Sequence, residues 1–190
     1  MKTRLWPHLN HRQCLLLHRL LISNILKQFS NSSKYNFLVY TTDKKLSDSL
    51  HKLKTKKQTG FDLGLRMYNV FKDELKNSRK VVLIGSDCVQ YSQAYISKAF
   101  NKLETGNDIV LGPTNDGGYC LVGMKKPYKF LFENIAWSTS DVLQESQRAA
   151  NRNNKTIYLL LDSMNDIDTI DDLNKLHELN ALPDWLKQFI

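Results

Sequence analysis

The stretch VVLIGSDCVQ (Val81–Gln90) changes character within a few residues. It begins with the short apolar run Val81–Ile84, which is typical of a buried strand. Gly85, Ser86 and Asp87 follow at once. Because Gly85 permits a sharp turn, the strand would hold the Asp87 carboxylate rigidly at its exit. A carboxylate in this place either caps the following helix or binds Mg²⁺ or Mn²⁺ through oxygen, and position alone does not separate the two interpretations.

Strand-like and helix-like segments alternate on both sides of this stretch. Apolar, aromatic and β-branched runs predict strands at 35–41, 54–57, 80–84, 108–112, 118–124 and 156–161. Apolar periodicity and capping residues predict helices at 9–29, 43–51, 62–75, 92–104, 140–153 and 168–179, before a short amphipathic tail. The alternation indicates one α/β domain with a doubly wound, mostly parallel sheet, in which ligands bind outside the carboxyl ends of the strands.

Composition fits one domain of ordinary size with a surplus of positive charge. The chain has 190 residues, a hydrophobic fraction of 42% and a formal net charge of +8. Such a surplus could attract nucleic acid, an anionic membrane or a phosphorylated small molecule. The densest basic run has six lysines between Lys44 and Lys57 with no Phe, Trp or Tyr among them, and no nucleic-acid motif accompanies it. We therefore expect a solvated surface there and no nucleic-acid partner.

Nothing in the sequence indicates a membrane span, a signal peptide or a disulfide framework. No apolar run approaches the roughly 18 residues that a spanning helix needs. His18 and Arg19 interrupt the leucine-rich stretch near the start. Cys14, Cys88 and Cys120 lie far apart, which argues against disulfide pairs or a zinc site and is typical of a cytoplasmic protein.

The segment GPTNDGGY (Gly112–Tyr119) contains three glycines, a proline and Asp116. Its adjacent glycines, Gly117 and Gly118, either form a hairpin turn or let the backbone approach a ligand closely. The residues alone support both interpretations equally.

The segment NDIDTIDDL (Asn165–Leu173) places several acids around the start of a predicted helix. Asp168 or Thr169 can cap this helix, and the acids that follow suit the positive end of its dipole. Asp166 and Asp168 precede the helix and could face Asp87 as metal ligands. Two carboxylates from separate strand ends are what a divalent ion bridging a diphosphate needs.

The segment QTGFDLGLRM (Gln58–Met67) is a loop that enters a predicted helix, with Arg66 one turn inside. The Arg66 guanidinium could form a local salt bridge or reach a phosphate. Spacing alone does not decide between them.

Together these segments resemble one family. The sequence is similar, nearly end to end, to small GT-A-like transferases known as radical-SAM/selenodomain-associated, or arsenosugar-biosynthesis-type, glycosyltransferases. The resemblance rests on six blocks in order: KTRL (2–5), QTGFDLGLRM (58–67), IGSDC (84–88), GPTNDGGYCLVG (112–123), WST (137–139) and DIDTIDDL (166–173). The wider superfamily includes the molybdenum-cofactor and phospholactate guanylyltransferases, which similarly place an aspartate after a central strand.

The resemblance implies a GT-A fold, a three-layer α/β/α arrangement with a mostly parallel mixed sheet, that binds a nucleotide and Mg²⁺ or Mn²⁺. By their match to the family's motifs, the expected metal-side carboxylates are Asp87, Asp168 and the neighbouring Asp166. The expected nucleotide- and phosphate-binding residues are Lys2, Arg4, Arg66 and Ser86. Asp116 is the expected catalytic base or acceptor contact, in an acceptor or sugar loop formed by Gly117, Gly118 and Tyr119.

The match has departures. Val89 stands where the family usually has proline, Ser86 where threonine is common, and Asn115 where glutamate is frequent. The larger departure is at the start, because the family has a first strand and a glycine-containing loop before KTRL. We therefore expect residues 1–190 to form a single domain that lacks this strand, with neighbouring strands unpaired and part of the base pocket missing. Either the strand is encoded upstream or the product is truncated.

The expected function is transfer of a group from a nucleotide-activated donor, a nucleoside-diphosphate sugar, to an unidentified small acceptor. One alternative is a nucleotidyltransferase that uses the same metal site and releases pyrophosphate. The other is a nucleotide-binding protein without turnover. Product analysis separates the first two, and binding retained without turnover would indicate the third.

Overall fold

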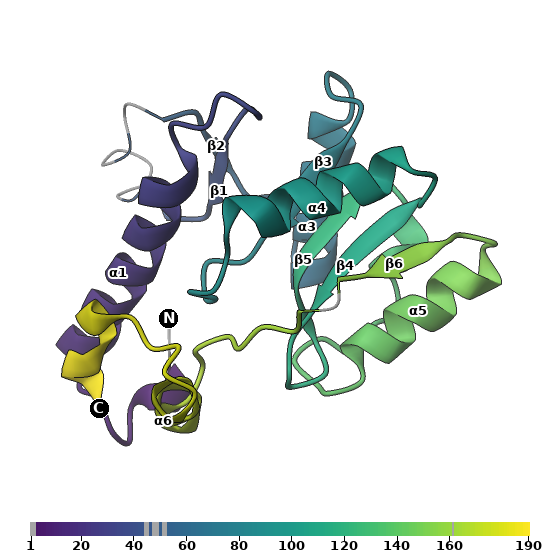
Figure 1. Cartoon of the computed structure of the whole chain (residues 1–190). Coiled ribbons are helices and arrows are strands. Elements are labelled where there is room, and N and C mark those ends of the chain that lie inside the picture. Colours follow the sequence, from purple (N-terminus) through teal and green to yellow (C-terminus); the bar gives the residue numbers. More distant parts are fainter. Residues whose placement is uncertain (1–2, 44–45, 47–49, 51–52, 161) are drawn as a thin grey trace.

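The computed structural model describes residues 3–43, 46, 50, 53–160 and 162–190 (Figure 1). Lys2, one of the expected phosphate-binding residues, lies outside the described residues, and so does most of the expected helix 43–51. Within the described part of the chain, no helix is both long enough and apolar enough to cross a membrane.

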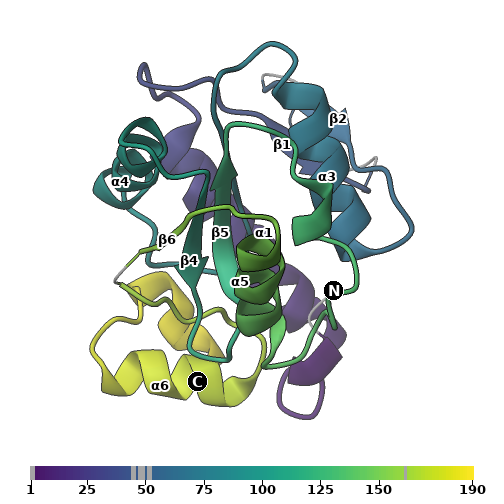
Figure 2. The same cartoon turned by 90° about the vertical axis from the view of Figure 1, so that its right-hand side faces the viewer.

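Within the described residues, the larger of two sheets has four strands in the order β3-β5-β4-β6 (Figures 1 and 2). The strands are β3 (Val81–Ile84), β4 (Ile109–Pro113), β5 (Tyr119–Met124) and β6 (Ile157–Leu159). β5 pairs antiparallel with both β3 and β4, whereas β4 pairs parallel with β6. Thus β3, β4 and β6 run in one direction and β5 in the other, so the expected mixed sheet is confirmed.

The opposite direction of β5 follows from the short connection before it. Only residues 114–118 join β4 to β5, which is a hairpin length, whereas a parallel crossover needs a dozen or more residues. The segment Gly112–Tyr119 is therefore a hairpin turn, one of its two interpretations from the sequence.

A second, smaller sheet stands apart from the first. It consists of β1 (Val39–Thr41) and β2 (Thr55–Lys57), which pair in parallel. β1 begins later than the predicted strand 35–41, because the residues before it turn toward α4. The ring of Tyr35 stacks on that of Phe100 with centroids 5.4 Å apart, and its hydroxyl donates to Gln93.

Helices cover both faces of the larger sheet, which confirms the three-layer arrangement (Figures 1 and 2). The covering helices are α1 (His11–Phe29), α3 (Leu63–Glu74), α4 (Gln93–Glu104) and α5 (Val142–Arg152), and α6 (Ile170–Glu178) lies beyond them. α4 and the end of α1 share one core cluster, in which Leu103 packs with Leu121 of β5. α3 and α5 share the cluster on the other face, with Phe71 and Val122. α6 packs with the first half of α1 and the 3-10 segment Asp184–Phe189.

Side-chain caps stand at the starts of α1, α3, α4 and α6. Ser92 caps α4 as predicted, and its hydroxyl accepts a hydrogen bond from the Tyr95 N–H (3.1 Å). Thr169 and Asp172 form a capping box at the start of α6. Thr169, and not Asp168, is therefore the N-cap, which leaves the Asp168 carboxylate on the segment before the helix.

Candidate functional site

Three segments from separate strands meet at one end of the larger sheet. Residues 163–167, which follow β6, lie between the β4–β5 hairpin and the residues that follow β3. On the hairpin side, the Met164 N–H donates to the Pro113 carbonyl (3.0 Å) and the Asn115 N–H donates to the Met164 carbonyl (3.2 Å). The segment is thus held as a short extension of the sheet.

The other side of this segment is tied to the exit of β3. Cys88 and Asp166 form an antiparallel bridge, and the Ile167 N–H donates to the Asp87 carbonyl (3.0 Å). These backbone contacts bring the aspartates at 87 and 166 to one edge, although 79 positions separate them in the sequence. The strand-end placement that the sequence predicted for both residues is therefore present.

Polar side chains reinforce this junction, and sequence reasoning did not identify them as a group. The Asn115 amide donates to Asn165 Oδ1 (2.6 Å) and accepts from the Ser163 hydroxyl (2.8 Å). The Asn165 N–H in turn donates to Gln90 Oε1 (2.8 Å). Asn165 is buried, so these bonds satisfy polar groups that would otherwise destabilise the fold. Only Asn115 carried a signal in the sequence, as a departure from the family pattern.

Asp166 is the most electrostatically perturbed carboxyl at this edge. Burial, followed by the nearby charge of Asp116, raises the pKa of Asp166 to about 6, with smaller contributions from Asp168 and Asp172. These contributions show that the acids of three segments interact with one another. The edge is therefore a partly buried acidic cluster.

Asp168 faces a basic residue from the start of the chain. Arg4 Nη1 lies 3.8 Å from Asp168 Oδ2, and both side chains are well exposed. Arg4, one of the predicted phosphate-binding residues, thus stands beside a predicted metal-side carboxylate. An exposed pair of this kind contributes little to stability, which leaves Arg4 able to exchange partners.

Ser86 and Asp87 lie where β3 ends. The Ser86 hydroxyl donates to Asp87 Oδ1 (3.4 Å), and both residues also line the large cavity between the two sheets. The predicted pair is therefore adjacent both to the acidic cluster and to an open space.

The donor set of the cluster suits a hard divalent cation. Carboxylate oxygens are preferred by Mg²⁺ and Mn²⁺. The raised pKa of Asp166 reflects burial first and then repulsion from the neighbouring carboxylates, and a bound cation would relieve that repulsion. Among the residues that the structure describes, no three metal-binding side chains are grouped closely enough to hold an ion by themselves. The residues therefore fit an ion held by one or two carboxylates together with substrate oxygens.

Asp116 has a structural role in the hairpin in addition to its place near Asp166. Its Oδ1 accepts hydrogen bonds from the Thr114 hydroxyl (2.5 Å) and the Gly118 N–H (3.1 Å). The Asp116 side chain is exposed, so it can still meet a molecule from solution.

The residues of the predicted acceptor loop lie in two different environments. Gly117 and Gly118 lie in the turn beside the acidic cluster. The Tyr119 ring instead packs edge-on against Trp137, with centroids 6.4 Å apart, and its hydroxyl accepts from Ser146 of α5 (3.5 Å). The Tyr119 side chain thus supports the loop from the core.

Arg66 has local partners. Its Nε donates to the Gly60 carbonyl (3.1 Å) and its N–H to the Asp62 carbonyl (3.2 Å). Within the described part of the chain its hydrogen bonds stay at the start of α3, but they go to backbone carbonyls and are not the local salt bridge that the sequence left open. Lys2 lies outside the described residues.

A family model described as an uncharacterized protein conserved in bacteria, DUF2064, matches residues 28–139, which is more than half of the chain. The chain belongs to the DUF2064 family. The matched region contains β3, Asp87 and the β4–β5 hairpin, whereas Asp166 and Asp168 follow it. Comparison with curated proteins gives no match.

Solved structures share the fold of this DUF2064 protein. A protein from Desulfovibrio desulfuricans G20, assigned as a nucleotide-diphospho-sugar transferase, is 28% identical with a TM-score of 0.86; the match covers 98% of this chain and 84% of that one. The 4-diphosphocytidyl-2C-methyl-D-erythritol synthase of Anaerococcus prevotii DSM 20548 is 12% identical with a TM-score of 0.59. The match covers 84% of this chain and 86% of that one. Molybdopterin-guanine dinucleotide biosynthesis protein A from Archaeoglobus fulgidus is 13% identical with a TM-score of 0.50. The match covers 89% of this chain and 83% of that one.

The last two similarities concern the fold alone, because their identities are low. The first extends to the sequence over nearly the full chain. The expected GT-A-like fold is confirmed, and the resemblance to small transferases of this superfamily is confirmed at the level of DUF2064 and these neighbours.

Proposed function

We propose that this DUF2064 protein is a metal-dependent transferase of the GT-A type, which moves a group from a nucleotide-activated donor to a small acceptor. The donor we propose is a nucleoside-diphosphate sugar. The observation that carries the proposal is that the exit of β3, with Asp87, is hydrogen-bonded to the segment of Asp166 and Asp168 near the carboxyl ends of the strands, where open α/β sheets bind ligands. The 28% identity to the Desulfovibrio desulfuricans protein supports the same class of substrate.

In this proposal the carboxylates of Asp87 and Asp168 hold Mg²⁺ or Mn²⁺, with Asp166 as a third candidate ligand. The ion, when bound, would neutralise charge that grows on the leaving diphosphate. The backbone contacts between the β3 exit and residues 163–167 fix the main chain that carries Asp87 and Asp166 before substrate arrives. This preorganisation reduces the rearrangement needed during the reaction.

The phosphate contacts are assigned to basic and hydroxyl side chains around the cluster. Arg4 is proposed to donate two parallel hydrogen bonds from its planar guanidinium to phosphate oxygens. Its Nη1 already lies 3.8 Å from Asp168 Oδ2, beside the proposed ion. Lys2 would add a point charge and Ser86 a hydroxyl donor. Arg66 could contribute only by exchanging its bond to Gly60 for one to phosphate.

The acceptor side is assigned to the hairpin. Asp116 is proposed as a base or acceptor contact, since its carboxylate is exposed and interacts with Asp166. Gly117 and Gly118 keep the turn compact beside it, and Tyr119 supports it from the core.

The test compares Asp87→Asn with the wild type in a thermal-shift screen of nucleoside diphosphates and nucleotide sugars, with and without Mn²⁺. A bound ligand at about 100 times its dissociation constant stabilises the fold by about 2.7 kcal/mol, which raises the melting temperature by several degrees. We expect a Mn²⁺-dependent shift in the wild type and none in Asp87→Asn, because asparagine keeps the shape but loses the charge.

Asp171→Asn is the matched control, since Asp171 is exposed in the first turn of α6 and undergoes the same chemical change. The control should keep the full shift. An unchanged shift in Asp87→Asn would refute the metal assignment, and a loss in both variants would indicate a general effect of charge.

A nucleotidyltransferase remains the second candidate, because the same carboxylates would serve it. Release of pyrophosphate from a nucleoside triphosphate would identify this reaction, whereas release of a nucleoside diphosphate would identify sugar transfer. A binding protein without turnover is the third candidate. Metal-dependent nucleotide binding with neither product formed would support it.

A further inference from the structure

Two cysteines from separate segments meet beside the candidate site. Cys88 follows the exit of β3 and Cys120 lies in β5, and 32 positions separate them in the sequence. β5 pairs antiparallel with β3, and the Gly85 N–H donates to the Cys120 carbonyl (2.9 Å). The chain then turns at residues 85–88 and brings the Cys88 thiol into hydrogen-bonding contact with the Cys120 thiol. Two thiols that no sequence spacing linked are therefore neighbours in the fold.

The surroundings of the two thiols differ. Cys88 is 2% exposed, whereas Cys120 is half-buried. The Tyr91 hydroxyl makes hydrogen-bonding contact with both thiols and donates to the Cys120 carbonyl (2.8 Å). The Cys120 thiol donates to the Gly112 carbonyl of β4 (3.5 Å). A small molecule from solution therefore reaches Cys120 first, and burial protects Cys88 from it.

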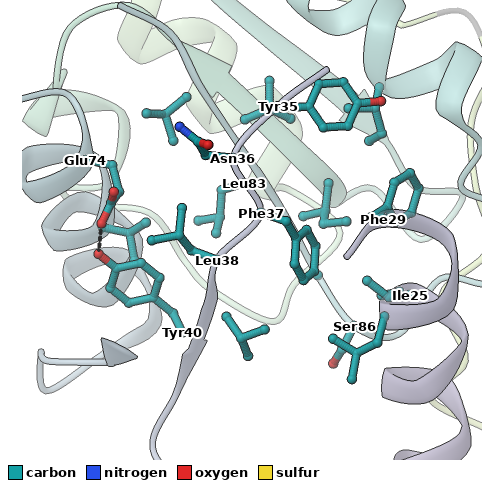
Figure 3. A pocket seen from close by; sticks show the side chains of 18 of the residues that line it. Ile25, Phe29, Tyr35, Asn36, Phe37, Leu38, Tyr40, Glu74, Leu83 and Ser86 are labelled. Atoms are coloured by element: carbon teal, nitrogen blue, oxygen red, sulfur yellow. Dashed lines mark hydrogen bonds between the residues drawn. The ribbon is translucent and has the colours of Figure 1, made fainter. Parts of the chain in front are cut away.

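The backbone also holds the two cysteines with different firmness. β5, which carries Cys120, is hydrogen-bonded on both sides, to β3 and to β4. The turn before Cys88 instead borders the cavity of about 1020 Å³ between the two sheets, which Gly85, Ser86 and Asp87 all line. Figure 3 shows Ser86 in the wall of this cavity. A movement that brings the cysteines closer is therefore made by the turn and not by β5.

We propose that Cys88 and Cys120 are a redox-sensitive pair, which a peroxide converts to an intramolecular disulfide. The S–S bond, about 2.05 Å long, is shorter than any hydrogen-bonded contact, so its formation draws Cys88 toward β5. Because Asp87 directly precedes Cys88, the movement displaces the backbone that carries the Asp87 carboxylate. The pair is thus a switch that acts on the candidate site, and its formation does not depend on the proposed transferase activity.

The oxidation has two steps, in which two electrons pass from the thiols to hydrogen peroxide. The Cys120 sulfur attacks one peroxide oxygen, the O–O bond breaks, and the products are a sulfenic acid at Cys120 and a first water. The Cys88 sulfur then attacks the sulfenic sulfur, the S–OH bond breaks, and a second water leaves with the Cys88 proton. An added dithiol returns two electrons by thiol–disulfide exchange and restores both thiols.

The test treats the full chain with hydrogen peroxide, alkylates the remaining thiols in denaturant and maps the peptides by mass spectrometry. We expect a linked pair of peptides that contains Cys88 and Cys120, whereas Cys14, which is buried in the cluster of α1 and α6, should be alkylated. Dithiothreitol should restore both thiols. Links that include Cys14, links between molecules only, or sulfinic acid at Cys120 without a link would each overturn the proposal.

A pair of serine variants separates the roles of the two thiols. In Cys88→Ser the Cys120 sulfenic acid has no partner, so dimedone, which traps sulfenic acids, should label Cys120. In Cys120→Ser, which keeps a donor for the Gly112 carbonyl, burial should leave Cys88 unlabelled. Labelling of Cys88 in place of Cys120 overturns the assigned order of the steps. If a variant does not fold, the peptide map of the wild type decides alone.

Amide hydrogen exchange tests the displacement of the turn. The Ile167 N–H donates to the Asp87 carbonyl (3.0 Å), so its exchange should be about tenfold faster or more in the disulfide form than in the reduced form. The Leu160 N–H, which donates to the Leu111 carbonyl of β4 (2.9 Å), is the control and should not change, because β5 separates β4 from the turn. Equal exchange of the Ile167 amide in both forms overturns the proposed effect on the candidate site.

Discussion

Asp166 is the residue at which the electrostatics of the acidic edge converge. Burial and the neighbouring carboxylates raise its pKa to about 6, whereas an aspartate in an unfolded chain has a pKa of about 3.9. The folded protein therefore holds the proton more tightly than the unfolded chain does. Ionisation of Asp166 destabilises the fold progressively as the pH rises from about 4 to about 6, and the effect is complete above pH 6.

We predict that Asp166→Asn melts several degrees above the wild type at pH 7.5 and at nearly the same temperature at pH 4. The amide cannot ionise, so it removes the unfavourable charge only where the wild type carries it. Differential scanning calorimetry at the two pH values measures the effect. Asp171→Asn, the exposed control, should show no comparable pH dependence. Equal stabilisation of Asp166→Asn at both pH values would contradict the electrostatic explanation.

Among the elements, the β4–β5 hairpin depends most on one residue, Gly117, whose backbone conformation and close packing exclude a side chain. Gly117 has a φ of 91°, in the left-handed region that side chains rarely adopt. A Cβ atom there would lie 2.1 Å from the Ser140 carbonyl oxygen. The Gly117 carbonyl also accepts from the Leu143 N–H (3.0 Å). The turn is therefore packed against the start of α5, which keeps Asp116 beside the acidic edge.

We predict that Gly117→Ala destabilises the protein by about 3 kcal/mol or more, because the strain of positive φ adds to a backbone clash. Urea unfolding measures the change. Gly106→Ala is the matched control, since Gly106 has a φ of 106° but no neighbouring atom within 4 Å of the new Cβ. The control should lose only about 1–2 kcal/mol. Equal losses in the two variants would show that the packing against Ser140 is unimportant.

The elements themselves could largely be predicted, because the signals that define them are local. The helix from Ser92 to Glu104 follows from apolar periodicity and a capping hydroxyl, and the structure has both. The pairing of strands depends on contacts between distant residues. The late start of β1 within the predicted strand 35–41, where Tyr35 turns onto Phe100, could therefore not be predicted from the sequence.

The same distinction holds for the candidate site. Strand-end position was enough to predict that Asp87 and Asp166 share an edge. The bonds of Asn115, Asn165 and Gln90 that fix this edge join three separate segments, and no local pattern indicates them.

At the scale of the whole molecule, the two sheets differ in how firmly they are held. A two-stranded sheet such as β1–β2 is marginally stable by itself. Its described ties to α3 converge on Glu74, which accepts a hydrogen bond from the Tyr40 hydroxyl and lies 2.5 Å from Lys56 Nζ. Burial raises the pKa of Glu74, but hydrogen bonds from Lys56 and Tyr40 outweigh burial and leave the pKa lowered. Ionised Glu74 thus stabilises the attachment of the smaller sheet.

We therefore predict that, within the proposed single domain 1–190, β1 and β2 open at a lower free energy than β4 and β5. Native-state hydrogen exchange measures both openings. Glu74→Gln should lower the opening free energy of the smaller sheet by about 1–2 kcal/mol and leave β4 and β5 unchanged. Glu104→Gln is the control, because Glu104 also pairs with a lysine but its side chain is 62% exposed.

The pH dependence of this opening gives an independent check. Because the folded pKa of Glu74 is lowered, its contribution is present above the unfolded value of about 4.5 and is lost as the pH falls through the folded value. The smaller sheet of the wild type should therefore open more readily as the solution is acidified, while that of Glu74→Gln should not change with it. A single opening free energy shared by all strands, unaffected by Glu74→Gln, would mean that the two sheets are held together by contacts other than those of Glu74.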